Sequence, residues 1–393
     1  MRLPVIGLLC AVAGGLAALG IGRATGIGGR TVTTVRETVV RPAAPRSAAP
    51  PAGSRPAGVT GSAFPAARIF RERSPGVVTV FAYFGGTGSQ GSGFVVSAAG
   101  TILTNAHVIT NAGETSGTVS PASSVYVVFP DHDRVAASIV GWDVFDDVGV
   151  LRVDPARHPL APLPLGRSAS VVVGQPVAAI GSPLGNADSL AVGIVSAVGR
   201  SIAALTAPNF QLTDAIQTDA PIGHGSSGGP LLDAAGRVIG ITAQIRSDSG
   251  GSAGIGFAVP IDAARRSAHA LLTKGHISYA YAGVQAEDLT PTLARHLRLS
   301  VDRGALVDRV APGGPADDAG IRGGTGSETF LGEEVTTGGD VIVAIDGRRV
   351  DDADTLVRIV TNTLRPGQRA TFTVVRDGRR RRLPLLLTSR PSR

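Results

Sequence analysis

The chain is poor in cysteine and histidine, and each scarcity excludes a kind of site or cross-link. Its single cysteine, Cys10, excludes an internal disulfide and a Cys-based zinc site. Seven histidines show no metal-ligand spacing, so the sequence predicts no metal and no cofactor. Hydrophobic residues still make up 43% of the 393 positions, enough for a sizeable core in two or so domains. The 53 glycines and 26 prolines are typical of a turn-rich β architecture with linkers.

The basic charge lies at the two ends of the chain and not in its middle. Residues 23–68 and 376–393 each carry a net charge of +6, and with Arg2 they leave residues 69–375 at −6 out of a total of +7. A basic groove on the folded body is therefore not expected, and nucleic acid is disfavoured as a partner. We interpret the basic ends as a feature of the cell envelope or of a position near a membrane.

The N-terminus contains one long uncharged apolar run, residues 3–22, in which Leu, Ala, Val, Ile and Gly dominate. As a helix this run would span about 30 Å, the thickness of a bilayer core. We expect residues 1–22 to be a transmembrane signal anchor, with a cleaved signal peptide as the alternative. Either alternative places the rest of the chain outside the cytoplasm, as a single-pass membrane protein or as a secreted one. Residues 23–63, rich in Pro, Ala and Arg, are expected to be a linker.

A glycine-rich loop around Ser227 is the most informative stretch of the sequence. Ser227 is surrounded by Gly225, Gly228 and Gly229, which allow backbone conformations closed to residues with a side chain. Such a loop can direct successive N–H groups at one point, as an oxyanion hole requires. Taken by itself, the loop could also be a flexible turn. His224, next to it, is interpreted as a surface-loop histidine.

A nucleophilic serine needs a base and an orienting carboxylate, and the chain offers both upstream. His107 follows an apolar strand-like run, and Asp147 stands at the start of a buried apolar run. The order His107, Asp147, Ser227 is that of the chymotrypsin-type triad and differs from the orders in subtilisin and the α/β-hydrolases. We therefore expect these three residues to be catalytic.

Eight segments resemble, in their amino-acid sequence and in their order, segments of the HtrA/DegP-type serine proteases. These proteases are chymotrypsin-like and carry C-terminal PDZ domains. The segments are Gly91–Phe94, Thr104–Val108, Asp147–Leu151, Ile180–Gly185, Gly193–Arg200, Gln217–Ala220, Ser226–Leu231 and Gly254–Pro260. The resemblance implies a two-barrel protease domain over residues 64–274 and a single PDZ domain over 279–388. It also implies an oxyanion hole of backbone N–H groups at Gly225, Ser226 and Ser227. One departure is Gly223 to Ser226, where the family usually has Asn-Pro-Gly-Asn.

Two neighbouring aspartates compete for the orienting role, and the family pattern favours Asp147 over Asp146. If a strand continued through both residues, alternation would turn Asp146 to the opposite face, toward solvent. Substitution of Asp146 would then matter little for catalysis.

The expected secondary structure is many short strands followed by a connecting helix, which favours a mostly β, antiparallel barrel fold. The strands are expected at 77–81, 93–96, 125–129, 135–140, 148–153, 177–180, 190–198 and 238–243, and the helix at 261–274, ending before Gly275. In the PDZ domain, a loop of four residues resembles the family's carboxylate-binding loop: Tyr281, Ala282, Gly283 and Val284. Residues 323–339 form a Gly-rich insertion, expected to be a surface hairpin or loop.

The sequence thus predicts an extracytoplasmic serine endopeptidase that degrades unfolded or damaged proteins and recognises C-terminal peptides through its PDZ domain. The family resemblance also implies a homotrimer. The alternative is a non-proteolytic chaperone or peptide-binding scaffold that uses the same surfaces without catalysis.

Overall fold

A computed structural model describes residues 64–391, apart from 113–118, 183–188, 204–205, 207–210, 224 and 244–254. The expected membrane segment 1–22, the linker 23–63 and His224 lie outside the described residues. Over the part of the chain that is described, no helix combines the length and apolar character needed to cross a membrane.

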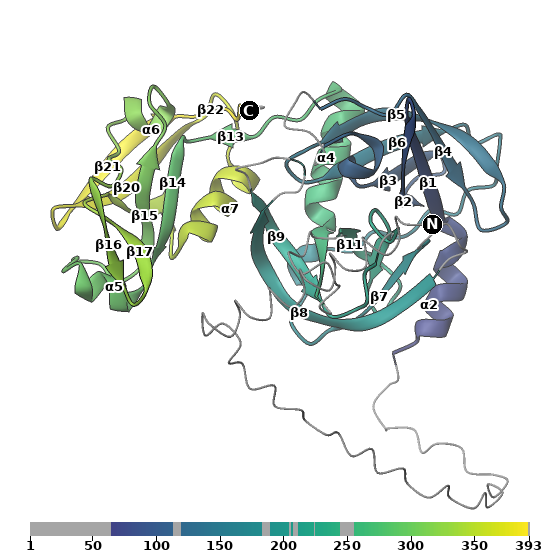
Figure 1. Cartoon of the computed structure of the whole chain (residues 1–393), viewed down its shortest axis with the longest axis horizontal. Coiled ribbons are helices and arrows are strands. Elements are labelled where there is room, and N and C mark those ends of the chain that lie inside the picture. The colour runs from purple at the N-terminus through teal and green to yellow at the C-terminus, as the bar shows by residue number, and fades with distance from the viewer. Residues whose placement is uncertain are drawn as a thin grey trace, which may run out of the picture. The chain divides into compact units, whose positions relative to one another are not determined.

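The first barrel closes from six antiparallel strands in the order β1-β2-β3-β6-β5-β4 (Figure 1). Alternating residues of β1, Val78, Val80 and Ala82, point into a core of their own, as expected for a strand with one face inside a barrel. The strands are β1 Val77–Phe84, β2 Thr87–Val95, β3 Thr101–Thr104, β4 Ser124–Val128, β5 Arg134–Asp143 and β6 Val148–Val153, with helix α2 Ala66–Arg73 and the 3₁₀ turn Ser74–Gly76 before them and the short helix α3 Ala106–Ile109 after β3.

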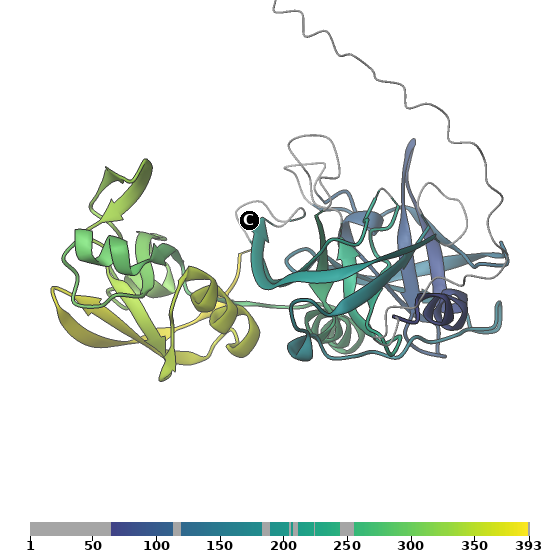
Figure 2. The ribbon, with the colours of Figure 1, turned by 90° about the horizontal axis from the view of Figure 1, so that it is seen from below.

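The second barrel closes in the order β10-β11-β12-β9-β8-β7, also antiparallel (Figures 1 and 2). One apolar cluster joins residues of both barrels, among them Leu103, Val148, Leu232 and Ile241, so the barrels share a core. The elements are the 3₁₀ turn Ser168–Ser170, β7 Pro176–Gly181, β8 Ser189–Ala203, β9 Gln211–Thr218, β10 Pro230–Leu232, β11 Val238–Ala243, β12 Gly256–Pro260 and helix α4 Ile261–Lys274.

Helix α4 follows the second barrel and buries one face in the shared core. Ile261, Ala264, Ala268 and Leu271 recur at helical spacing on that face. The helix ends at Gly275, whose φ of +74° suits glycine and whose N–H donates to the carbonyl of Leu271 at 3.1 Å. The predicted helix is confirmed at both ends.

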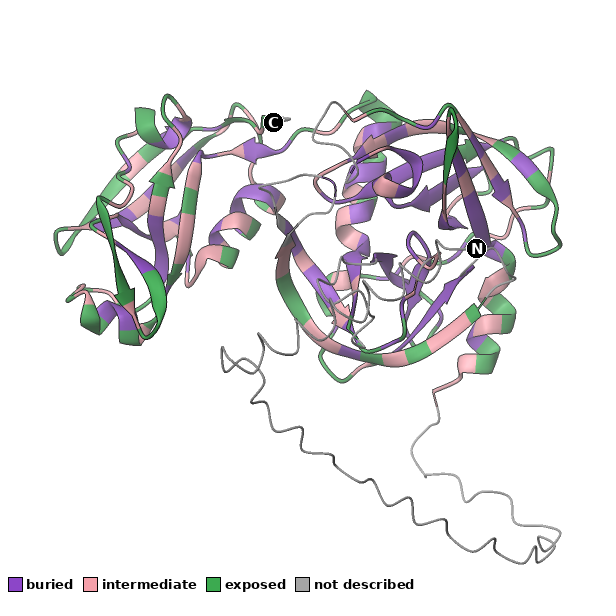
Figure 3. Ribbon diagram, in the orientation of Figure 1, coloured by how far each residue is buried: buried purple, intermediate pink, exposed green. Residues whose placement is uncertain are grey.

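The C-terminal part is a small β sheet with three helices and its own apolar core (Figure 3). Strands β14-β15-β18-β20-β21 form the sheet, with β19 beside β18, while β13 pairs with β22. The elements are β13 Ala280–Tyr281, β14 Val284–Leu289, α5 Pro291–His296, β15 Gly304–Val310, α6 Pro315–Asp318, β16 Gly326–Phe330, β17 Glu333–Thr337, β18 Val341–Ile345, β19 Arg348–Arg349, α7 Ala353–Thr363, β20 Arg369–Arg376, β21 Arg379–Leu386 and β22 Thr388–Ser389.

The predicted fold class is confirmed: two closed barrels precede a β-rich domain. The insertion 323–339 contains the two-stranded hairpin β16–β17, as expected. The expected strands at 148–153 and 238–243 match β6 and β11. The boundaries 64–274 and 279–388 stay predictions.

Candidate active site

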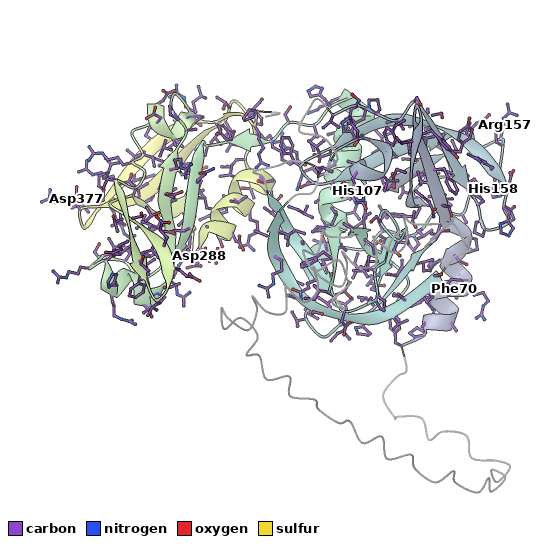
Figure 4. All side chains as sticks on the ribbon, viewed as in Figure 1. Phe70, His107, Arg157, His158, Asp288 and Asp377 are labelled. Carbon is purple, nitrogen blue, oxygen red and sulfur yellow. The ribbon has the colours of Figure 1, made fainter. Side chains whose placement is uncertain are left out.

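His107 and Asp147 meet in the first barrel, in the arrangement that the triad hypothesis requires. His107 lies on α3, just after β3, and Figure 4 labels it there. Its Nδ1 lies 2.8 Å from Oδ2 of Asp147, and its backbone N–H donates to Oδ1 at 3.0 Å. Both carboxylate oxygens therefore hold the same residue, which fixes the orientation of the imidazole.

Asp147 ends the turn between β5 and β6 and is itself tightly held. Its φ is +50°, a left-handed value that is uncommon outside glycine and that aspartate and asparagine adopt more often than most residues. The side-chain amide of Asn105 donates to the Asp147 carbonyl at 2.9 Å. The Asp147 side chain is 7% exposed and that of His107 21% exposed. The carboxylate is thus sheltered from water while the imidazole keeps an open edge.

The pKa of His107 reflects two opposing effects. Burial by itself lowers the pKa, because it disfavours the imidazolium. The negative charge of Asp147 and its hydrogen bond raise it, and together they leave the pKa of His107 above its ordinary 6.5. An imidazolium formed by accepting a proton would therefore be stabilised at this position.

Ser227 is buried in a turn in which three successive carbonyls, those of residues 225–227, accept hydrogen bonds. The Ser92 hydroxyl donates to the Gly225 carbonyl at 2.6 Å, and the Ser92 N–H donates to the Ser227 carbonyl at 2.7 Å. The Thr242 hydroxyl donates to the Ser226 carbonyl at 2.6 Å. With these three carbonyls bonded, the loop is held in one conformation.

Close packing behind this loop explains its glycines. Gly228 has a φ of +89°, and a Cβ there would lie 2.1 Å from the carbonyl oxygen of Ser92. Any side chain at this position would push the first barrel away from the serine loop. Gly225 also has a left-handed φ, +89°.

Ser92 is a residue of the site that sequence reasoning missed. Besides holding Gly225, its fully buried hydroxyl accepts the N–H of Ser182 at 2.9 Å, so one side chain of the first barrel ties two segments of the second. The signal was present, since Ser92 lies between two glycines in the segment 91–94. Only the fold reveals which segments it joins.

The three predicted oxyanion amides are not equivalent. The N–H of Ser226 donates to the Gly223 carbonyl at 3.0 Å, within the loop. The amides of Gly225 and Ser227 stay the predicted donors to a substrate oxyanion.

The expectation that Asp146 faces solvent was wrong. Asp146 is 3% exposed, and its carboxylate accepts hydrogen bonds from Arg266 and from the Tyr279 hydroxyl, both at 2.8 Å. The strand alternation does not apply, because residues 144–147 form a turn between β5 and β6 and not a strand.

The predicted carboxylate-binding loop, Tyr281 to Val284, joins β13 to β14. Gly283 has a φ of +76°, and the carbonyls of Ala282 and Gly283 accept the N–H groups of Ala316 and Ala311 at 2.9 and 2.8 Å. These bonds connect the loop to α6 and to the segment that precedes it. Its role in peptide binding stays a prediction. In the described ranges, no group of three or more His, Cys, Asp or Glu residues could hold a metal ion.

Comparison with known families agrees with the architecture. The trypsin-like peptidase domain family matches residues 91–241, and the PDZ domain family matches residues 280–387. The fold and these matches define a trypsin-like peptidase domain followed by a PDZ domain.

Individual relatives narrow the class further. The structure of the HtrA-type protease AlgW with a tripeptide is 34% identical, with a TM-score of 0.68, and the match covers 83% of this chain and 97% of that one. A probable periplasmic serine endoprotease, DegP-like, from Pseudomonas fluorescens is 37% identical over 77% of this chain. The putative serine protease HhoA from Synechocystis is 39% identical over 69% of this chain. The chain belongs to the HtrA/DegP-like serine protease family.

The matches to the two curated relatives cover 57% and 64% of their lengths, so the chain spans little more than half of each.

Proposed function

We propose that the protein is an extracytoplasmic serine endopeptidase that cleaves unfolded or damaged proteins. The observation that carries the proposal is the pair His107 and Asp147, in which both carboxylate oxygens bond to the histidine. The glycine-rich loop of Ser227 is in turn held by hydrogen bonds to its carbonyls. A trypsin-like peptidase domain that keeps all three residue types supports catalysis over binding alone.

In the proposed mechanism, Ser227 Oγ attacks the peptide carbonyl while His107 Nε2 takes the hydroxyl proton. Asp147 accepts the Nδ1–H of His107, which keeps Nε2 free to act as the base and stabilises the imidazolium. The N–H groups of Gly225 and Ser227 hold the oxyanion of the tetrahedral intermediate. His107 then gives its proton to the leaving amine, and water, activated by the same histidine, releases the acyl group from Ser227.

The substrates and partners follow from the PDZ domain and the relatives. A PDZ domain adds an extended peptide to a sheet edge and captures its terminal carboxylate with loop amides, here Tyr281 to Val284. The AlgW structure holds a tripeptide, which supports peptide recognition in this chain too. The periplasmic relatives support a location outside the cytoplasm. Anchoring by residues 1–22 and trimer formation belong to the same proposal.

Digestion of casein with and without a serine-directed phosphonate tests the proposal. Casein has little stable structure, so a protease for unfolded proteins should cut it, and the phosphonate should stop the reaction by modifying Ser227. A chaperone or scaffold would bind casein and leave it intact with or without the reagent. Intact casein from correctly folded protein would therefore overturn the endopeptidase in favour of that alternative.

A further inference from the structure

Beside the catalytic aspartate lies a buried cluster of charged and polar groups that the mechanism does not use. Asp143 closes β5 and is 1% exposed, and Asp146 is 3% exposed. Tyr279, in the segment after α4, is also 3% exposed, and its hydroxyl contacts Oδ2 of both aspartates. Arg266 and Ser267 of α4 complete the cluster, donating to Asp146 at 2.8 Å and to Asp143 at 2.7 Å.

The cluster controls the backbone that leads to Asp147. Oδ1 of Asp143 accepts the N–H groups of Phe145 and Asp146, at 2.9 and 3.3 Å, and so shapes the β5–β6 turn. Oδ2 of the same carboxylate contacts Tyr279 and Ser267. One side chain thus connects the turn to two residues outside it, and Asp147 is the last residue of that turn.

The number of protons available in the cluster limits which group donates in each hydrogen bond. A phenol has one proton to donate, yet the Tyr279 oxygen meets two carboxylates. The second contact is satisfied when Asp143 carries a proton and donates it to the phenol, while Tyr279 donates to the Asp146 carboxylate, which Arg266 neutralises. Burial and the charge of Asp146 raise the pKa of Asp143 to about 6, so this protonated arrangement predominates below about pH 6 and an ionised Asp143 above it.

We propose that Tyr279, with Asp143 and Asp146, is a positioning residue for catalysis, holding the β5–β6 turn so that Asp147 stays against His107. The inference rests on the proposed function, because these residues would support Asp147 of the proposed triad. Rings secure the arrangement further: Phe145 packs edge-on against Tyr279 with centroids 5.4 Å apart, and the Arg390 guanidinium lies 5.1 Å from the Phe145 ring.

Tyr279→Phe is the most direct variant, since it removes one hydroxyl and keeps the ring and every charge. Released from Tyr279, the turn should let Asp147 drift from His107. We expect kcat on a casein-derived peptide to fall by about tenfold to 10²-fold, as for other small misplacements of catalytic groups, with KM nearly unchanged. Tyr126→Phe in β4 is the matched control and should behave as wild type.

The pKa of His107, measured by NMR on ¹⁵N-histidine-labelled full-length protein, separates positioning from general damage. His107→Gln identifies the resonance. Because Asp147 raises the pKa and burial lowers it, Tyr279→Phe should lower the pKa of His107, and Tyr126→Phe should not. This readout needs no peptidase activity, so an inactive wild type would contradict the proposed function and leave the positioning test intact.

A double-mutant comparison completes the test. In an Asp147→Asn background, Tyr279→Phe should cause no further loss of kcat, because the residue through which it acts is already gone. Ser267→Ala, which removes another donor to Asp143, should repeat the effects of Tyr279→Phe in weaker form and serves if that variant does not fold. An unchanged pKa of His107 in a folded Tyr279→Phe or Ser267→Ala protein, or an equal loss of kcat in both backgrounds, would overturn the proposal.

Discussion

At the scale of single residues, the site depends on one carboxylate whose two oxygens make different hydrogen bonds to the same histidine. Oδ1 of Asp147 takes the backbone N–H of His107, and Oδ2 takes the imidazole. The first contact fixes the position of the residue and the second fixes its tautomer. A side chain that reproduced only one of them would leave either the ring or its backbone free to move.

The pH dependence of catalysis follows from this pairing. As the proposed base, His107 works only when it is neutral, and its pKa lies above 6.5. The midpoint of the acid-side rise of kcat/KM should therefore lie above pH 6.5. Asp147→Asn removes the charge that raises the pKa and leaves burial to lower it. The limb should then move to lower pH, and kcat should drop by about 10⁴.

Initial rates on a peptide substrate between pH 5 and pH 9, in steps of about half a unit, check this. Asp154→Asn, an exposed aspartate of the same barrel, is the control and should keep the wild-type profile. An acid limb that stays in place in Asp147→Asn would show that another group titrates.

At the scale of elements, the helices and strands with a regular apolar pattern could be predicted from the sequence. Strands β6 and β11 are apolar runs, and α4 has apolar residues at helical spacing. Such patterns depend only on neighbouring residues, so the sequence alone reveals them. The β5–β6 turn was not predictable, because Asp143 shapes it by bonding to its amides, and Tyr279 lies 136 positions away from Asp143. Ser92 was missed for the same reason: its partners Gly225 and Ser182 are distant in sequence.

The end of α4 allows a clean stability test. Gly275 has a left-handed φ of +74°, and nothing lies within 4 Å of where a Cβ would be. Gly275→Ala should therefore cost only the backbone strain, about 1 kcal/mol of unfolding free energy. Urea unfolding measures the cost.

Gly86→Ala is the matched control, since its site is equally open and its φ is not left-handed. It should change stability little. Equal costs for the two variants would show that backbone conformation at Gly275 is not what stops the helix.

At the scale of the whole molecule, the chain links a protease of two barrels to a PDZ domain through the segment that follows α4. Tyr279 in this segment contacts the β5–β6 turn that ends at Asp147, the proposed catalytic aspartate, and lies two residues before the predicted peptide-binding loop begins. The segment between the two domains is thus also part of the surroundings of the candidate active site.

Peptide binding by the PDZ domain should depend on a free C-terminus. Loop amides at Tyr281 to Val284 would capture a carboxylate, so amidating an apolar peptide should weaken binding clearly, because the charge-assisted hydrogen bonds are lost. Fluorescence anisotropy with acid and amide forms of one peptide, on full-length protein, measures the difference. Equal affinities would contradict this mode of recognition.

The most direct test of the central claim is the rate of peptide hydrolysis by Ser227→Ala, His107→Ala and the double variant. Nucleophile and base act as one unit, so each single change should reduce kcat by several orders of magnitude, about 10⁶-fold in a comparable triad, and the double variant should be scarcely slower. Near wild-type hydrolysis by folded Ser227→Ala, or losses that multiply in the double variant, would contradict the assignment of His107 and Ser227 to one catalytic unit.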